Sequence, residues 1–233
     1  MLSHRFPRLV YKFLYYLPYS RLRKQYGKGI THLFILNSLI CGGAELEAIN
    51  YIKAIQKLNP KAKINIITTT SNPSTWSNKV NGYAKIIPFG KYFSKLPYVI
   101  QIKLLANLIF EMRPKIIHLN NSALGYDLFI YYANKISLIS KIFVSVFCNI
   151  ITAQSESTGW PVTHLPRFVK YVTKIFCDNS TYLRYLNKNL SFRKEILSCH
   201  YQPVSLKKMY LLIIIVTTSF GQVDSIYKKD PIF

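Results

Sequence analysis

Short strand-like segments alternate with helix-like segments through most of this 233-residue sequence, and this alternation limits the possible folds more than any other feature. Segments rich in Ile, Val and Phe have the length of buried strands at residues 31–39, 63–70, 84–89, 115–120, 141–147, 174–179 and 195–201. Helical apolar patterns separate most of them, at residues 95–112, at residues 122–136 and in the stripe Ala48, Ile49, Ile52, Ile55 and Leu58. This order predicts an α/β fold with a Rossmann-like, doubly wound parallel sheet.

Two adjacent glycines, Gly42 and Gly43, stand between the first predicted strand and the first predicted helix. Glycines at this place permit a tight turn and let another molecule approach the backbone, where free N–H groups at a helix start can hold an anion. Glu45 and Glu47 follow, and carboxylates near a helix start interact favourably with the helix dipole. The acids therefore indicate a helix start, whereas the glycines indicate a nucleotide- or sugar-handling site.

Ligands of such a sheet bind outside the carboxyl ends of its strands. Clusters that follow predicted strands, and are expected to meet at that edge, are Cys41 to Glu45, His118 to Ser122, Phe147 to Ile150 and Cys177 to Ser180. The candidate substrate-binding residues are Gly42, Gly43, Glu45, His118, Asn120, Asn121, Cys148, Asp178 and Asn179. Helix capping also accounts for the polar residues in the second and fourth clusters, and a core position accounts for His118. Both interpretations stay open, and no catalytic residue is assigned.

The chain is strongly basic, with 31 Lys and Arg against 9 Asp and Glu, a formal charge of +22. Half of its residues are hydrophobic, which excludes a disordered chain and suits one good core. The charge would attract any polyanion, such as nucleic acid, phosphorylated sugars or an anionic membrane, although compositional bias is an equal explanation. Four separated cysteines indicate neither a zinc site nor a disulfide framework, so we expect reduced and mostly buried thiols.

Residues 1–30 form a separate N-terminal segment in which basic residues alternate with aromatic ones. The segment has no continuous apolar region and no small-residue cleavage site, so it does not resemble a secretory signal. Near an anionic bilayer, its basic and aromatic side chains would suit the interface. The apolar run at residues 209–216 is too short to span a bilayer, and no transmembrane helix is predicted.

Three parts of the sequence together resemble a known family. They are Gly42-Gly43-Ala44-Glu45, the segment EMRPKIIHLNNS at residues 111–122, and residues 159–186 followed by HYQPV at residues 200–204. They resemble the N-terminal half of retaining GT-B glycosyltransferases of group 1, the GT4-like family. The resemblance covers about Thr31 to Val204 and implies an acceptor-side domain at residues 31–204.

The resemblance implies a two-domain enzyme whose N-terminal domain holds the acceptor and whose C-terminal domain holds a nucleotide-sugar. It implies no metal and no cofactor other than that donor, and the sequence has no Asp-x-Asp. Amides and basic side chains would then stabilise the departing diphosphate, and Gly42 and Gly43 match the loop that approaches the diphosphate or acceptor.

The sequence departs from this family in two places. Where many relatives have a histidine after the fifth strand, it has Phe147 and Cys148. After Val204 the family would continue into a donor domain with two glutamates eight positions apart, but no Glu follows Glu195. Residues 220–233 can be back-translated with freely chosen synonymous codons so that a second reading frame resembles the first strand and loop of such a domain. We therefore expect an aberrant tail at residues 205–233, produced by a frameshift between about Ser205 and Phe220.

The predicted function is transfer of a sugar to a polysaccharide or glycolipid acceptor by the full-length form, in a pathway that builds cell-surface polysaccharide. We expect the truncated chain to be inactive and to be cytoplasmic, or peripheral at the inner face of the membrane. The alternative is a non-catalytic Rossmann-like module that binds anionic glycolipid or a membrane surface. Specific nucleic-acid binding is not predicted, because only the charge supports it.

Overall fold

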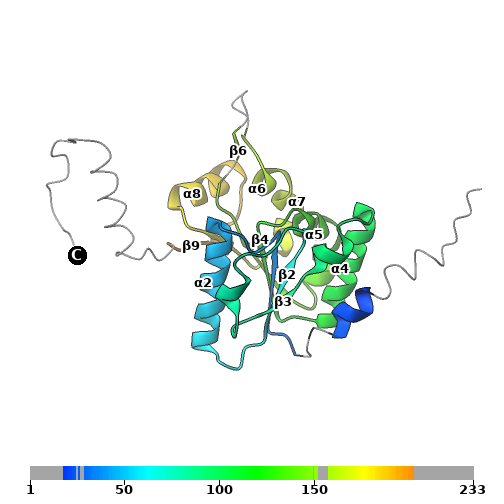
Figure 1. Ribbon diagram of the computed structural model, residues 1–233. Helices are drawn as coiled ribbons and strands as arrows, with labels where there is room; N and C mark the ends of the chain where they lie inside the picture. Colours follow the sequence, from blue (N-terminus) through cyan, green and yellow to red (C-terminus); the bar gives the residue numbers. More distant parts are fainter. Residues whose placement is uncertain (1–17, 25, 27–28, 149, 152–156, 202–233) are drawn as a thin grey trace, which may run out of the picture. The chain divides into compact units, whose positions relative to one another are not determined.

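A computed structural model describes residues 18–24, 26, 29–148, 150–151 and 157–201 (Figure 1). Seven parallel strands form one sheet in the order β3-β2-β1-β4-β5-β8-β9. Their bounds are β1 His32–Leu36, β2 Ile64–Thr68, β3 Lys85–Ile87, β4 Ile116–Asn120, β5 Lys141–Ser145, β8 Lys174–Cys177 and β9 Leu197–Cys199. Each falls within a predicted strand segment, so the expected Rossmann-like parallel sheet is confirmed.

Helices connect the strands and cover both faces of the sheet (Figure 1). The longer ones are α2 Gly43–Leu58, α4 Tyr98–Met112, α5 Ala123–Ile136 and α8 Ser180–Asn189. Shorter helices are η1 Ser77–Val80, α3 Phe89–Phe93, α6 Trp160–Thr163, α7 Leu165–Phe168, η2 Val169–Tyr171 and η3 Lys194–Ile196. The two-stranded hairpin of β6 Ile150–Ile151 and β7 Ser157–Thr158 was not predicted, because two residues per strand are too few to show a pattern.

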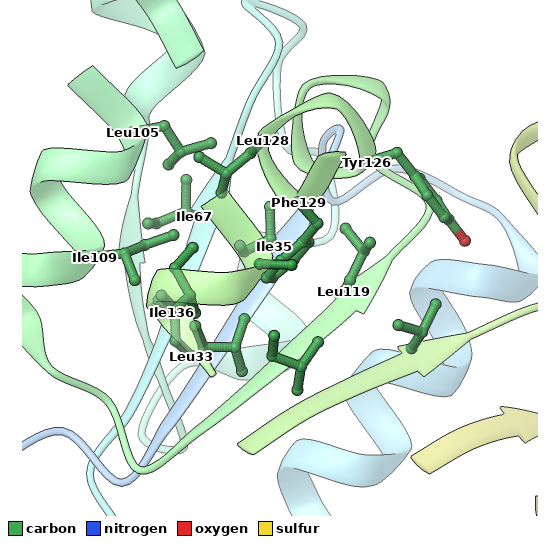
Figure 2. Packing of buried hydrophobic residues seen from close by; sticks show 14 of the residues in the cluster. Leu33, Ile35, Ile67, Leu105, Ile109, Leu119, Tyr126, Leu128, Phe129 and Ile136 are labelled. Atoms are coloured by element: carbon green, nitrogen blue, oxygen red, sulfur yellow. The ribbon is translucent and has the colours of Figure 1, made fainter. Parts of the chain in front are cut away.

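Strand β1 shows how the apolar pattern divides the core between the two faces. Side chains alternate along a strand, so Leu33 and Ile35 face α4 and α5, whereas Phe34 and Leu36 face α2. The larger cluster, shown in part in Figure 2, includes Ile109 of α4 and Phe129 of α5. In β1 every residue after His32 is buried. The strand therefore appears in the sequence as a continuous apolar run.

The order of the strands reverses beside β1, which pairs with β2 on one side and with β4 on the other. A reversal of this kind leaves a crevice between the two crossover connections at the carboxyl ends of the strands. In this chain, the connection from β1 to α2 contains Gly42, and the connection from β4 to α5 contains Asn121. The topology therefore places two of the predicted clusters at the same switch point.

The structure corrects one detail of the predicted core. Leu58 was assigned to the apolar stripe of α2, but 86% of its surface is exposed. Ala48, Ile49 and Ile52 of that stripe are buried. Leu58 is the last residue of α2 and lies beyond the part of the helix that packs on the sheet.

Residues 1–17 of the N-terminal segment and the predicted aberrant tail at residues 205–233 lie outside the described residues. Within the described ranges, no helix has both the length and the apolar character needed to cross a membrane.

Candidate functional site

The glycine turn lies at the carboxyl edge of β1 and begins α2. Gly42 is the N-cap residue of α2, has extended backbone angles and makes no side-chain capping bond. A Cβ atom added at Gly42 would overlap the Glu45 carboxylate, whereas one added at Gly43 would have no atom within 4 Å. Gly43 therefore borders open space. Gly42 has no side chain to cap the first-turn N–H groups of α2, and the Glu45 carboxylate lies beside Gly42 at this helix start.

Asn120 joins the end of β4 to this turn. Its amide Nδ2 donates a hydrogen bond to the Ala44 carbonyl oxygen at 3.2 Å. The side chain is buried, and its Oδ1 has no hydrogen-bond partner among the described residues. The next residue, Asn121, has a φ of 50°, which is uncommon for a residue with a side chain and turns the backbone sharply at the switch point. The glycine turn and the cluster at the end of β4 therefore meet, as predicted.

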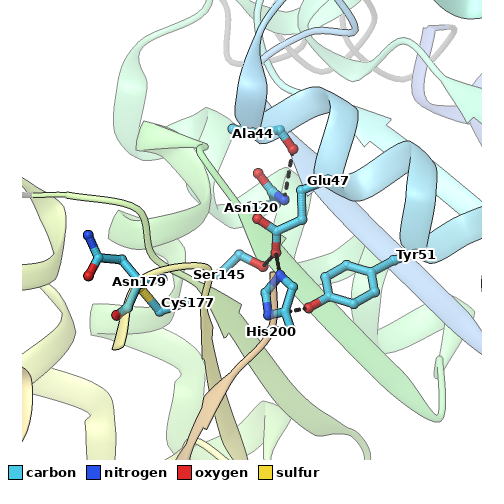
Figure 3. Close-up of polar contacts among 8 residues, drawn as sticks. All are labelled: Ala44, Glu47, Tyr51, Asn120, Ser145, Cys177, Asn179 and His200. Carbon is cyan, nitrogen blue, oxygen red and sulfur yellow. Dashed lines mark hydrogen bonds and ion pairs between the residues drawn. The ribbon is translucent and has the colours of Figure 1, made fainter. Parts of the chain in front are cut away.

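Glu47 is the centre of a buried polar cluster below the turn (Figure 3). Its carboxylate is buried, and Oε1 accepts a hydrogen bond from the Ser145 hydroxyl at 2.9 Å. Nε2 of His200 lies 3.2 Å from the same oxygen. These contacts attach the first turns of α2 to the ends of β5 and β9.

Tyr51 completes this cluster one helical turn after Glu47. Its hydroxyl lies 3.0 Å from Nδ1 of His200, and burial, followed by the charge of Glu47, raises the pKa of Tyr51. Burial lowers the pKa of His200, and the charge of Asp178 opposes that effect. The His200 imidazole that contacts Glu47 is therefore neutral at pH 7.

Strand β8 ends at Cys177, and the residues that follow it mainly contact their neighbours along the chain. Oδ1 of Asn179 accepts hydrogen bonds from the backbone N–H groups of Thr181 and Tyr182 at 2.9 and 3.1 Å, so it caps α8. Asp178 is partly buried and lies close enough to His200 to influence its pKa. Burial raises the pKa of the Cys177 thiol to about 11.

The prediction of mostly buried thiols is wrong, because Cys41, Cys148 and Cys199 are exposed and only Cys177 is buried. Cys41 and Cys148 lie in connections that follow strands β1 and β5, where the apolar sheet does not cover them. Among the described residues, no three His, Cys, Asp or Glu side chains form a group that could hold a metal ion.

The candidate residue His118 lies in the core. Its ring stacks on Phe34 with centroids 4.2 Å apart, and its Nε2 lies 3.1 Å from Nδ1 of His32. Burial, followed by the charge of His32, lowers the pKa of His118 to about 3. His118 is therefore neutral at pH 7 and packs between the sheet and α2, next to Tyr51.

This buried histidine should make the domain sensitive to acid. In the unfolded chain His118 would bind a proton as the pH falls through about 6.5, whereas in the folded chain it stays neutral down to about pH 3. Stability is therefore lost as the pH falls. Between pH 7.5 and 5.0 we expect His118 alone to lower the free energy of unfolding by about 2 kcal/mol.

Urea unfolding at the two pH values would measure this loss of unfolding free energy. In the His118→Phe variant, the contribution of His118 to the loss should be absent. The Val144→Ala variant, which removes buried apolar atoms of β5 without changing a titrating group, should keep the parent's pH dependence. An identical pH dependence in His118→Phe and the parent would show that His118 is not the source.

Sequence reasoning missed Ser145, Tyr51 and His200, and it treated Glu47 only as a helix-start residue. A weak signal was present, because Glu47 and Tyr51 are four residues apart and flank the buried stripe of α2. No pattern in the sequence linked them to His200, which is far away along the chain and reaches α2 only because β9 joins the sheet.

No protein-family model matches the chain, and no curated protein matches it in sequence. Its structure is similar to a glycosyltransferase from Rickettsia africae ESF-5, with a TM-score of 0.50 and 14% identity over 84% of this chain and 51% of that one. It is also similar to the lipopolysaccharide outer core galactosyltransferase WaaB in its apo form, with a TM-score of 0.52 and 13% identity over 76% of this chain and 46% of that one. At these identities the likeness shows the fold, the Rossmann-like N-terminal half of a GT-B structure.

The chain spans about half the length of these two solved structures.

Proposed function

We propose that this chain is the acceptor-side part of a glycosyltransferase that uses a nucleotide-sugar donor. One observation carries the proposal. The uncapped start of α2, with open space beside Gly43, lies at the switch point of a sheet shared with solved glycosyltransferases. A helix start of this kind favours an anionic group, and the basic chain would attract one.

The surrounding residues support a positioning role for the turn. Asn120 holds the Ala44 carbonyl, and Glu47 holds the following turn of α2 against β5 and β9. With the backbone held in place, its N–H groups need little rearrangement to stabilise a diphosphate or an acceptor oxygen. Asp178, Asn121 and Cys148 lie in connections at the same edge and are proposed to line the acceptor side.

In finer detail, we propose a retaining enzyme of the GT4-like group that works without a resident metal ion. Its proposed acceptor is a growing cell-surface polysaccharide or a glycolipid, and its proposed location is the cytoplasm or the inner face of the membrane. The N-terminal segment is proposed to touch an anionic membrane. In its described part, residues 18–24, Tyr19 and Arg23 contact Glu111 of α4 and so attach that part of the segment to the domain.

A transfer assay tests the proposal. The 233-residue chain, and a longer version that adds a donor-binding domain, would be incubated with a panel of nucleoside diphosphate sugars and a membrane glycolipid extract. We expect nucleoside diphosphate release and glycolipid labelling only from the longer version, in the presence or absence of EDTA. Donor and acceptor must meet in a closed cleft, and that positioning can be worth about 7 to 11 kcal/mol of barrier.

The two chains give distinguishable outcomes. Transfer by the 233-residue chain alone would contradict the proposal that it supplies only one side of the cleft. No transfer and no donor binding by either version would contradict the proposed enzyme class. Loss of activity with EDTA would contradict the metal-free mechanism.

A further inference from the structure

Two of the four cysteines are partners in neighbouring strands of the sheet. Cys177 is the last residue of β8, Cys199 is the last residue of β9, and the two residues are in register. Neighbouring strands of a sheet lie about 4.8 Å apart. A disulfide joins two Cα atoms that are about 4.4 to 6.8 Å apart, so the register gives this pair the spacing that the bond requires.

Both cysteine side chains lie on the same face of the sheet. Ile175 and Cys177 of β8 belong to the larger apolar cluster, and Leu197 of β9 packs against that cluster. Because side chains alternate along a strand, Cys199 projects on the same face as Leu197. The two thiols therefore stand next to each other across the strand boundary.

The residues beside the two cysteines support this placement. Phe176 precedes Cys177 and His200 follows Cys199, and their rings contact each other with centroids 6.0 Å apart. Both rings also contact Tyr51 of α2, the helix that covers the other face. The alternation is therefore the same in both strands, and it directs the two cysteines away from α2.

The two thiols differ in their access to solvent. Cys199 is exposed and lies in β9, the edge strand of the sheet, whereas Cys177 is buried. Burial is the main cause that raises the pKa of Cys177 to about 11, and the charge of Cys199 makes a smaller contribution in the same direction. An oxidant from solution therefore meets Cys199 first, and the Cys177 thiolate forms rarely at pH 7.

A structural role explains only one of the two cysteines. Sγ of Cys177 accepts a hydrogen bond from the Asn179 N–H at 3.3 Å, next to the start of α8, and Figure 3 shows both residues. This role does not explain an exposed cysteine in register with it. Cys148 follows β5, the other neighbour of β8, but the register that places Ser145 beside Phe176 leaves Cys148 beyond Cys177.

We propose that Cys199 is a site of reversible thiol oxidation and that Cys177 converts the product into a disulfide between the ends of β8 and β9. The Cys199 thiolate attacks one sulfur of a small disulfide, such as glutathione disulfide, and expels one glutathione thiolate. The Cys177 thiolate then attacks Sγ of Cys199 in this mixed disulfide and expels the second glutathione thiolate. Two electrons pass to glutathione disulfide, and the two protons of the cysteine thiols pass to the two glutathione thiolates.

The proposed bond lies apart from the glycine turn and does not depend on sugar transfer. It would attach the edge strand β9 covalently to β8, and it would draw Sγ of Cys177 away from the Asn179 N–H at the start of α8. Disulfides that form transiently in response to oxidants are the usual kind in cytosolic proteins, which agrees with the proposed location of the chain.

The test incubates the folded 233-residue chain with glutathione disulfide, blocks the remaining thiols by alkylation and maps the linked peptides by mass spectrometry. We expect a bond between Cys177 and Cys199 that dithiothreitol reverses. Cys177→Ala should stop at glutathione bound to Cys199, and Cys199→Ser should leave Cys177 as a free thiol. The matched control, Cys41→Ser, removes another exposed thiol and should form the bond like the parent.

The rate of the second step tests which thiol attacks. Because its pKa is about 11, the Cys177 thiolate becomes about tenfold more abundant with each pH unit between about pH 7 and pH 9. Conversion of the mixed disulfide into the internal bond should accelerate by the same factor. A conversion that does not depend on pH would mean that another group attacks Cys199, which would contradict the proposal.

Two other outcomes would overturn the proposal. Glutathione bound to the exposed cysteines, without any bond between Cys177 and Cys199, would show that the buried thiol does not reach its partner. A bond between Cys148 and Cys177 would assign the buried thiol to β5 instead. Cys199→Ser alters an exposed position, so its result does not depend on a change in the core. No readout uses transfer, and these outcomes are independent of the proposed function.

Discussion

A Gly43→Val variant is expected to keep the stability of the parent within about 1 kcal/mol and to lose at least about a hundredfold in nucleotide-sugar binding or transfer. The first part follows from the space beside Gly43, where an added Cβ contacts no atom. The second part follows from the proposed site, because valine would fill the space through which a ligand approaches the start of α2. Isothermal titration with a nucleoside diphosphate sugar, together with urea unfolding, would measure both parts in the longer version that adds a donor-binding domain.

A control separates the ligand effect from a general effect on the helix. Ser180→Val puts the same side chain at the first position of α8, which begins at the same edge of the sheet. It should cost similar stability and leave binding within about twofold, because α8 has its own cap in Asn179. If Gly43→Val binds and transfers like the parent, the turn is not the ligand site.

A Glu47→Ala variant is expected to lose about 1.5 to 3 kcal/mol of unfolding free energy at pH 7.5. The change removes a buried carboxylate that accepts a hydrogen bond from Ser145 and contacts His200. The Ser145 hydroxyl would then be left in the interior without the acceptor it now has, and α2 would lose its attachment to β5 and β9. Urea unfolding of the variant and the parent would measure the loss.

Glu45→Ala is the matched control on the same helix. Glu45 is also buried and acidic, but it lies in the first turn against Gly42, so we expect a cost of only about 1 kcal/mol. A double-mutant cycle of Glu47→Ala with Ser145→Ala should give a coupling energy of about 1.5 to 3 kcal/mol. Equal costs at the two glutamates, with no coupling to Ser145, would mean that the polar cluster does not hold α2 in place.

Much of the fold could be predicted because its information is local. Each strand of the sheet is short and largely apolar, and strands such as β2, in which all five residues are buried, stand out as continuous Ile-rich runs. Helix α5 could be placed from its periodicity, and Ser122, whose hydroxyl accepts the Gly125 N–H at 3.1 Å, could be recognised as its cap. The small hairpin and the exposed Leu58 were beyond such reasoning, because two-residue strands have no period and a helix pattern does not say where the sheet ends.

The sequence by itself determined the parallel sheet and the glycine turn at its carboxyl edge, because strand length, helical spacing and paired glycines act through neighbouring residues. Only the tertiary structure decided what surrounds that turn. It turned Asn120 toward Ala44 and buried Glu47 against Ser145 and His200. These contacts depend on the order and direction of the strands, which join residues from distant parts of the chain, and no local pattern records which side chains will face one another.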